Sequence, residues 1–216
     1  GHIENGQNKS LIYNNSKLIA DNEWTVTRML DGNNLDYYPT RSAFSLYNDG
    51  SFHVDWIYNI DGQIYTYELP SLNSSARKPM NKPSKGFPKG ARVWNTKTGI
   101  GGGPVLIKNG TTRNSWMEEL FDADTEVKPQ ACVARSAIGV TNDGKLILFV
   151  CEGNGHDSKI PGMTLDQLTR LMKSFGCIDA LNLGGGNSTG MLINGFPVFQ
   201  SQTDRSNVVP SALFFK

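Results

Sequence analysis

Short apolar runs separated by turn-forming residues recur along this chain, and such runs predict β-strands. Apolar runs that open with Arg41 and Arg135 lead into Asn-Asp-Gly, and each continues into a second β-like run, at 51–58 and 145–152. Asn-Asp-Gly between two such runs is typical of a hairpin turn. The sequence therefore predicts hairpins at 41–58 and 135–152.

The two hairpins are copies of one motif. Arg41–Gly50 reads RSAFSLYNDG and Arg135–Gly144 reads RSAIGVTNDG, so Arg, Ser, Ala, Asn, Asp and Gly recur in the same places 94 residues apart. Two related halves explain this recurrence most economically, and chance reuse of a hairpin motif is the alternative.

The clearest helical period lies at 165–175. Thr164 and Gln167 fit a capping box before it, and Gly176 fits the position just after the last turn. We expect the apolar face of this helix to cover a sheet. That face consists of Leu165, Leu168, Leu171, Met172 and Phe175.

The order of these elements defines the expected fold. A long Pro- and Lys-rich loop at 69–92 and a strand at 105–108 lie between the hairpins, and the helix leads into a strand at 177–183. Hairpins with one late helix are typical of the α+β class. We predict a single α+β domain over residues 1–216, with mixed, mostly antiparallel sheets, two related halves and few helices.

Charge and apolar content exclude several partners. The net charge is only +1, from 21 Lys and Arg against 20 Asp and Glu, so no overall field attracts nucleic acid or an anionic membrane. No apolar run reaches the roughly 20 residues that a transmembrane helix needs. The chain does not begin with Met. We expect that a signal peptide has been removed from a secreted, periplasmic or cell-surface protein.

Three cysteines are too few for a disulfide scaffold and too scattered for a zinc site. The second hairpin would bring Cys132 and Cys151 near each other at its open end, so a disulfide between them is one alternative. We expect instead that these two and Cys177 are buried free thiols.

Two glycine clusters suggest a binding site. Gly101–Gly103 precedes a strand, and Gly184–Gly186 follows one and leads into Asn187, Ser188 and Thr189. Glycine permits close backbone approach, and the polar residues add donors and acceptors, so such loops suit phosphate or sugar oxygens. The alternative is that the glycines serve tight packing alone.

Charged residues flank the predicted strands. Arg41 and Arg135 open the two copies, where they could bind one anionic ligand between the halves or pair with local carboxylates. Glu152 follows an apolar strand at the same sheet edge as the second glycine cluster, which suits a base or nucleophile, although a merely hydrogen-bonded Glu is the alternative. His156 and Asp157 are loop residues or, alternatively, a weak cation site.

The stretches GGGPVLIKNG, ARSAIGVTNDGKLILFVCEGN and GMTLDQLTRLMKSFGCIDALNLGGGNSTGMLINGFPV occur in this order within residues 92–216. This succession resembles the phosphodiester glycosidase family, and the first half resembles it more loosely through the Arg41 copy. The resemblance implies removal of N-acetylglucosamine, or a related sugar, from a sugar-1-phosphodiester. It thus implies a small-molecule or glycan substrate.

The family motifs carry over with one large departure. The family's Arg-Thr-Ala-Ile-Gly corresponds to Arg135–Gly139, and its Val-Asp-Gly corresponds to Cys151–Gly153, where the acid becomes Glu. The family's Asn-Leu-Asp-Gly-Gly-Gly-Ser-Ser-Thr corresponds to Asn182–Gly190, and its Asp is replaced by Gly184. This leaves three outcomes open: inactivity, another sugar, or a substitute acid such as Asp204 or Asp157.

A phosphate leaving group has a second pKa of about 6, so it departs as an anion and needs charge stabilisation more than a proton. We expect Arg135, with Arg41 or Arg205, and N–H groups of the glycine loops to hold the phosphate, while Glu152 acts as nucleophile or base. Arg135 and Asp204 are also catalytic candidates. The expected substrate-binding residues are Arg41, Gly102, Gly103, Asn182, Gly185, Gly186, Asn187, Ser188, Thr189 and Arg205. We expect no cofactor, and the need for a divalent cation stays open. A silent glycan- or phosphosugar-binding protein is the rival, and a structural domain without a ligand is a second rival.

Overall fold

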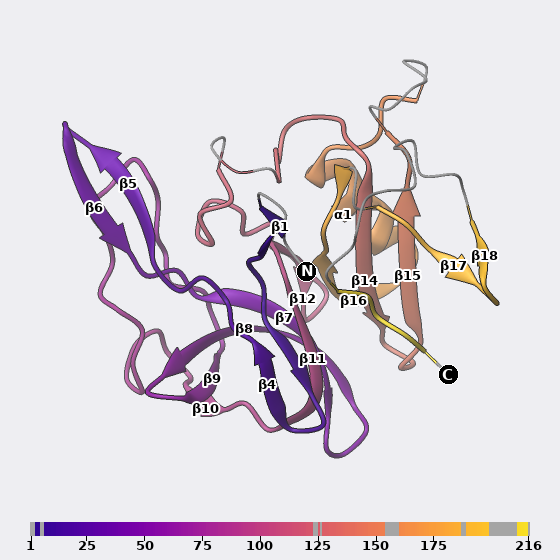
Figure 1. Cartoon of the computed structure of the whole chain (residues 1–216), viewed down its shortest axis with the longest axis horizontal. Coiled ribbons are helices and arrows are strands. Elements are labelled where there is room, and N and C mark those ends of the chain that lie inside the picture. Colours follow the sequence, from indigo (N-terminus) through magenta and orange to yellow (C-terminus); the bar gives the residue numbers. More distant parts are fainter. Residues whose placement is uncertain are drawn as a thin grey trace.

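Two antiparallel sheets form most of the computed structural model, which describes residues 3–4, 7–122, 125, 127–153, 160–186, 189–198 and 211–215 (Figure 1). The seven-stranded sheet has the order β10-β9-β8-β7-β11-β3-β4, and the five-stranded sheet has the order β13-β12-β16-β14-β15. With one helix among the described residues, the expected mostly antiparallel α+β class is confirmed.

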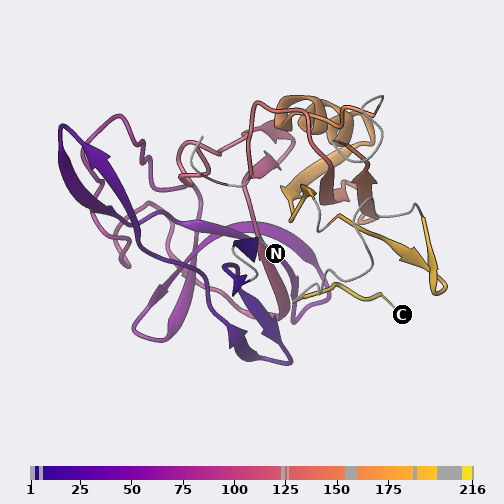
Figure 2. The same ribbon diagram turned by 45° about the horizontal axis from the view of Figure 1, so that its top comes forward.

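The strands of the larger sheet are β3 (Ile12–Asn14), β4 (Lys17–Ala20), β7 (Arg41–Tyr47), β8 (Phe52–Ile60), β9 (Gln63–Tyr67), β10 (Arg92–Val93) and β11 (Thr96–Gly102). Those of the smaller sheet are β12 (Val105–Lys108), β13 (Thr111–Thr112), β14 (Arg135–Thr141), β15 (Leu146–Cys151) and β16 (Cys177–Asn182). Three further two-stranded pairs are β1 (Ile3–Glu4) with β2 (Gln7–Asn8), β5 (Val26–Leu30) with β6 (Asn33–Tyr37), and β17 (Leu192–Ile193) with β18 (Phe196–Pro197). Figure 2 shows the β5–β6 hairpin projecting from the larger sheet, on the side away from α1 (Leu165–Ser174).

Both predicted hairpins are present, and they share one register. In the first copy Arg41 pairs with Ile57, and in the second Arg135 pairs with Cys151 at the corresponding positions. A third strand lies antiparallel to each copy, β11 beside β7 and β16 beside β14. The structural repeat therefore extends beyond the hairpins and includes the strands that lead into the two glycine clusters.

The helix α1 forms as predicted and covers the smaller sheet. Thr164 accepts a hydrogen bond from the Gln167 backbone N–H, and the Gln167 side chain accepts one from the Thr164 N–H, which completes the capping box. Leu165, Leu168 and Met172 are buried against the sheet. Phe175, which we expected on the buried face, is 44% exposed because the helix ends at the residue before it.

An apolar core lies between the two sheets. Phe44, Val54 and Trp56 of the larger sheet pack with Ile138 and Leu181 of the smaller sheet in one buried cluster. Burial of this much aliphatic and aromatic surface is the main attraction between the two related halves.

The Glu119 carboxylate lies fully buried beside this core and joins both sheets. It accepts hydrogen bonds from the Ser42 hydroxyl (2.7 Å) on β7 and the Trp56 indole (3.2 Å) on β8. It also accepts from the Val105 backbone N–H (2.9 Å) on β12 and from the Ser115 hydroxyl (2.6 Å). Four donors compensate much of the cost of burying this group.

A second polar link joins the sheets through Lys108. Its ammonium group lies 3.4 Å from the Asp55 carboxylate and 3.2 Å from that of Asp179. The Tyr47 hydroxyl donates to Asp55 (2.9 Å), and burial beside this carboxylate raises the pKa of Tyr47. Lys108 therefore has two nearly buried carboxylates as partners, one from each sheet.

The three cysteines are free thiols, as expected, but only Cys177 is buried, while Cys132 and Cys151 are half-buried. The expectation of three buried thiols was therefore wrong for two of them, because both lie near the open end of the β14–β15 hairpin, where the sheet ends. No helix among the described residues is long and apolar enough to cross a membrane.

We predict that Glu119→Ala lowers the free energy of unfolding by about 3–5 kcal/mol, because it leaves four donors without their acceptor. Glu119→Gln keeps one acceptor oxygen, and its amide can donate to the Ser42 hydroxyl, so the expected loss is at most about 1 kcal/mol. Urea unfolding measures both values, and equal losses would contradict the network.

The same pair of proteins tests the charge of this site. Burial raises the pKa of the Glu119 carboxyl. A raised native pKa gives stability that is complete below the ordinary pKa of 4.5 and is lost as pH rises through the native value. Between about pH 4 and about pH 8, the stability of Glu119→Gln relative to wild type should therefore increase. A constant difference would show that the carboxyl titrates normally.

We predict that unfolded protein, without reductant, reacts with a thiol reagent at all three cysteines. In the native state Cys177 should react far more slowly than Cys132, because it is buried and burial raises its pKa to about 11. Mass spectrometry after alkylation gives the count. One reactive thiol would instead indicate a Cys132–Cys151 disulfide.

Candidate functional site

Three strands of the second half meet at one edge of the smaller sheet. β15 and β16 both run antiparallel to β14, so Cys151 and Asn182 at their carboxyl ends lie where β14 begins at Arg135. Glu152 directly follows β15 and is half-buried. The structure thus brings Glu152 and the strand that leads into the second glycine cluster to the same edge, as the sequence predicted.

The two glycine clusters meet at Asn182. The Gly103 N–H donates to the Asn182 carbonyl (2.8 Å), and the Asn182 side-chain amide donates to the Gly103 carbonyl (2.7 Å). The Asn182 N–H in turn donates to the Pro104 carbonyl (3.1 Å). The connection between β11 and β12 is therefore held against the end of β16.

Close packing explains why glycine is needed at several of these positions. A Cβ on Gly102 would lie 2.6 Å from the Asn182 carbonyl oxygen, and one on Gly185 would lie 2.6 Å from the Ala134 carbonyl oxygen. Gly103 has φ +144°, and a Cβ there would lie 2.2 Å from the Phe121 ring. The approaches are between parts of this chain, which favours the packing alternative for Gly102, Gly103 and Gly185.

Gly186 differs from these three. A Cβ there would meet nothing within 4 Å, although its φ of +57° favours glycine. Its N–H donates to the Ala134 carbonyl (3.0 Å), and the residue itself is exposed. Of Gly102, Gly103, Gly185 and Gly186, only Gly186 therefore has no described atom close to its Cβ position.

Two buried oxygens at this loop have no hydrogen-bond partner among the described residues. They are Asn182 Oδ1 and Thr189 Oγ1, on side chains that are 2% and 3% exposed. An unpaired buried acceptor is costly, and a ligand hydroxyl would satisfy it. Asn182 Oδ1 can only accept and therefore suits a sugar hydroxyl, whereas the Thr189 hydroxyl can donate or accept and suits a sugar or a phosphate.

Arg135 is engaged by the backbone of its own half. Its Nε donates to the Met163 carbonyl (2.9 Å), Nη1 to Val127 (2.6 Å), and Nη2 to Lys128 (2.8 Å) and Ala131 (3.0 Å). Burial lowers its pKa to about 10. Every guanidinium nitrogen thus already has an acceptor, which favours a positioning role over the phosphate contact that we expected.

Arg41, its counterpart, is less fully engaged. Nε donates to the Glu23 carbonyl (3.1 Å) and Nη1 to the Glu119 carbonyl (2.5 Å), while Nη2 has no partner among the described residues. Neither arginine pairs with a carboxylate within the described part of the chain, so the local ion pairs that we considered are not what holds them.

Several predicted site residues lie outside the described residues. These are Asn187, Ser188, Asp204 and Arg205, together with His156 and Asp157. Their proposed roles therefore stay predictions. Within the described part of the chain, no three His, Cys, Asp or Glu residues are grouped so that they could hold a metal ion.

Sequence reasoning missed Glu119. It stands in an irregular segment without strand or helix period, and its partners come from three distant segments. A charged residue beside the apolar pair Leu120 and Phe121 was the one available signal.

The chain is similar to a known protein family and to solved structures. The sequence model of the phosphodiester glycosidase family matches residues 4–216. A similar fold occurs in the catalytic domain of zebrafish N-acetylglucosamine-1-phosphodiester alpha-N-acetylglucosaminidase, auto-inhibited by its pro-peptide. The TM-score is 0.51, and the sequence identity is 21% over 88% of this chain and 49% of that chain. A hypothetical protein from Synechocystis gives a TM-score of 0.49 and 17% identity over 89% of this chain and 45% of that chain. The chain spans about half the length of these two proteins. No curated protein sequence matches it.

We predict that Gly102→Ala lowers the free energy of unfolding by about 1–3 kcal/mol, because its Cβ would collide with backbone that cannot rotate away. Gly86→Ala is the matched control, since a Cβ there meets nothing within 4 Å. The control should change stability by less than about 0.5 kcal/mol. Thermal or urea unfolding measures both, and a harmless Gly102→Ala would show that the two clusters are not in close contact.

Proposed function

Because the chain belongs to the phosphodiester glycosidase family, we propose that it hydrolyses a sugar-1-phosphodiester to a free sugar and a phosphomonoester. The observation that carries this proposal is the position of Glu152 at the sheet edge where Asn182 presents a buried, unpartnered oxygen. A half-buried acid at the same sheet edge as an acceptor suited to a sugar hydroxyl supports attack at an anomeric carbon.

The roles follow from this placement. In one route Glu152 attacks the anomeric carbon, and water then hydrolyses the glycosyl–enzyme bond to release the sugar; in the other, Glu152 takes a proton from a water that attacks this carbon. In both routes the C–O bond to the phosphate breaks with the electron pair leaving on the phosphate. Asn182 Oδ1 and Thr189 Oγ1 accept hydrogen bonds from sugar hydroxyls. Arg135 acts indirectly, by fixing the 127–131 segment against the start of β14 through its carbonyl contacts.

The leaving group needs little acid catalysis. A phosphomonoester has a second pKa of about 6, so it departs as an anion at neutral pH. Positive charge near the phosphate then stabilises the transition state more than proton donation does. Arg41 is the proposed source of this charge, since its Nη2 is not engaged by the described protein groups.

A catalytically silent glycan- or phosphosugar-binding protein is the second candidate. It is favoured by Gly184, which stands where the family resemblance places an Asp. The polar groups just described would bind the same ligand in this case, but no bond would break. A secreted, periplasmic or cell-surface location also belongs to our proposal and rests on the family resemblance.

Hydrolysis of a nitrophenyl-phosphate diester of N-acetylglucosamine tests the two candidates. We predict turnover by the wild type and a loss of at least about 100-fold in kcat for Glu152→Gln, as for removal of a general base or nucleophile. Glu68→Gln is the matched control, because Glu68 is an exposed carboxylate on the larger sheet. It should retain full activity.

Each outcome has one meaning. Turnover that Glu152→Gln retains in full removes Glu152 from the mechanism. Saturable binding of the diester without release of sugar, across a panel of sugars, replaces the enzyme with the binding protein. Circular dichroism of both variants shows whether the fold is intact.

A further inference from the structure

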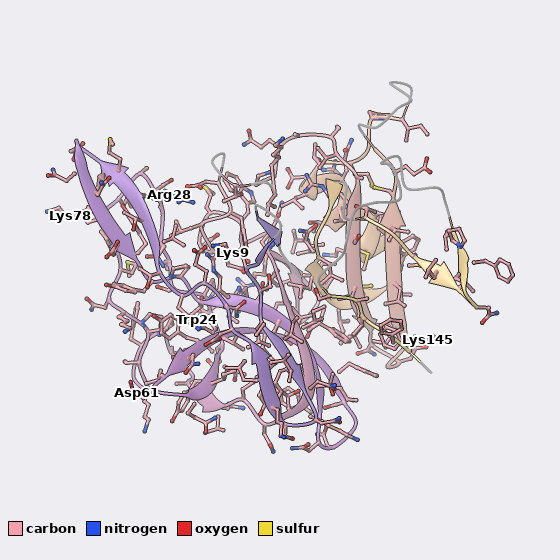
Figure 3. The ribbon with its side chains drawn as sticks, viewed as in Figure 1. Lys9, Trp24, Arg28, Asp61, Lys78 and Lys145 are labelled. Carbon is pink, nitrogen blue, oxygen red and sulfur yellow. The ribbon has the colours of Figure 1, made fainter. Side chains whose placement is uncertain are left out.

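A small cavity opens beside the first arginine of the repeat. It has a volume of about 70 Å³ and lies among the start of β7, the β5–β6 hairpin and the segment around Leu120. Three cationic side chains line it, from Lys9, Arg28 and Arg41, together with Asn22, Glu23 and Gly102. Figure 3 shows Lys9 and Arg28 in this part of the molecule, and Lys145 on the far side, at the smaller sheet.

Arg41 places a buried positive charge at this cavity. The residue is 7% exposed, and two of its three guanidinium nitrogens donate to the carbonyls of Glu23 and Glu119. Nη2 has no partner among the described residues, and no described carboxylate forms an ion pair with the group. Burial lowers its pKa to about 10, so the group still carries its charge at neutral pH. The nearby Glu119 carboxylate and the Phe121 ring, 4.9 Å from the guanidinium, offset the cost of burying this charge only in part, and a bound anion would offset more of it.

Asn22 adds a second donor without a partner. The side chain is 7% exposed, and its Oδ1 accepts from the Leu11 N–H (2.7 Å), which fixes the orientation of the amide. Its Nδ2 is buried and has no hydrogen-bond partner among the described groups. A ligand oxygen in the cavity would supply the acceptor that this buried amide donor lacks.

The other two cations at the cavity each form an ion pair with one carboxylate. Lys9 lies 3.3 Å from the Glu23 carboxylate, and Arg28 lies 3.2 Å from that of Asp122. The Nε of Arg28 is buried and has no partner among the described residues. The groups without a described partner at this cavity are all donors: Arg41 Nη2, Asn22 Nδ2 and Arg28 Nε.

Size and chemistry together select the ligand. A cavity of this volume holds about five water-sized groups, and a phosphoryl group has a comparable number of heavy atoms. Its oxygens accept hydrogen bonds only, and Arg is well suited to contact them.

We propose that this cavity is a phosphoryl-binding site, in which Arg41 Nη2 and Asn22 Nδ2 donate to the oxyanion and Lys9 and Arg28 supply further charge. The phosphoryl group belongs either to inorganic phosphate or to a sugar phosphate. Only the choice of a sugar phosphate rests on the proposed hydrolysis, because the binding itself needs no turnover.

Isothermal titration of the full chain with inorganic phosphate, and separately with glucose 1-phosphate, tests this site. Asn22→Asp keeps the Oδ1 acceptor and replaces the donor with a negatively charged oxygen, so it should weaken binding by at least 10-fold. Lys9→Met should weaken binding by about 3-fold and reduce its salt dependence. Lys145→Met is the control, because it removes one exposed charge at the other sheet, and it should bind as the wild type does.

The two ligands distinguish the sources. Tighter binding of glucose 1-phosphate supports a sugar-phosphate ligand, and equal binding supports inorganic phosphate. No saturable binding of either, or equal affinity in a folded Asn22→Asp, would overturn the site. If the site is overturned in this way but turnover is unchanged in Asn22→Asp, the proposed hydrolase activity still holds. If phosphate binds but the protein shows no turnover, the binding site holds and the hydrolase is refuted.

Discussion

The Glu119 carboxylate is the constraint on which the arrangement of the two sheets depends. It accepts hydrogen bonds from β7, β8 and β12, so both sheets must be in place before this buried acid is satisfied. Its backbone carbonyl also accepts from Arg41, and its carboxylate lies close to where a Gly103 side chain would be. Since a half-satisfied buried carboxylate is strongly unfavourable, this one residue limits how the halves can shift relative to each other.

The contact at Gly103 follows from the same constraint. β11 leads directly into β12 through Gly102, Gly103 and Pro104, so the chain passes from one sheet to the other beside Glu119. Asn182 then ties this crossing to the end of β16 with three hydrogen bonds to Gly103 and Pro104. The carboxyl ends of both third strands are therefore held together, and polar groups from the two halves come near one another.

The sequence predicted those features that local signals determine. The Asn-Asp-Gly turns predicted both hairpins, and Thr164 with Gln167 predicted the start of α1, because the interacting groups lie a few residues apart. The role of Arg135 could not be predicted from the sequence, because its hydrogen-bond acceptors are backbone carbonyls, which every residue carries. The cavity at Arg41 was equally hidden, because its lining comes from segments between Lys9 and Thr125 that no common pattern links.

The two copies of the repeat have the same register but different chemistry. Every guanidinium nitrogen of Arg135 donates to a backbone carbonyl, whereas one guanidinium nitrogen of Arg41 has no described partner. In each copy the first arginine pairs with a residue of the second strand, which is Cys151 for Arg135 and Ile57 for Arg41. The next residue along the chain is Glu152 in one copy and the buried Tyr58 in the other. The acid thus belongs to the second half and the available cation to the first, so neither half alone contains both groups that the proposed reaction uses. The contact of Gly102 and Gly103 with Asn182 fixes the crossing between the sheets against the end of β16, and it thereby ties the two halves together.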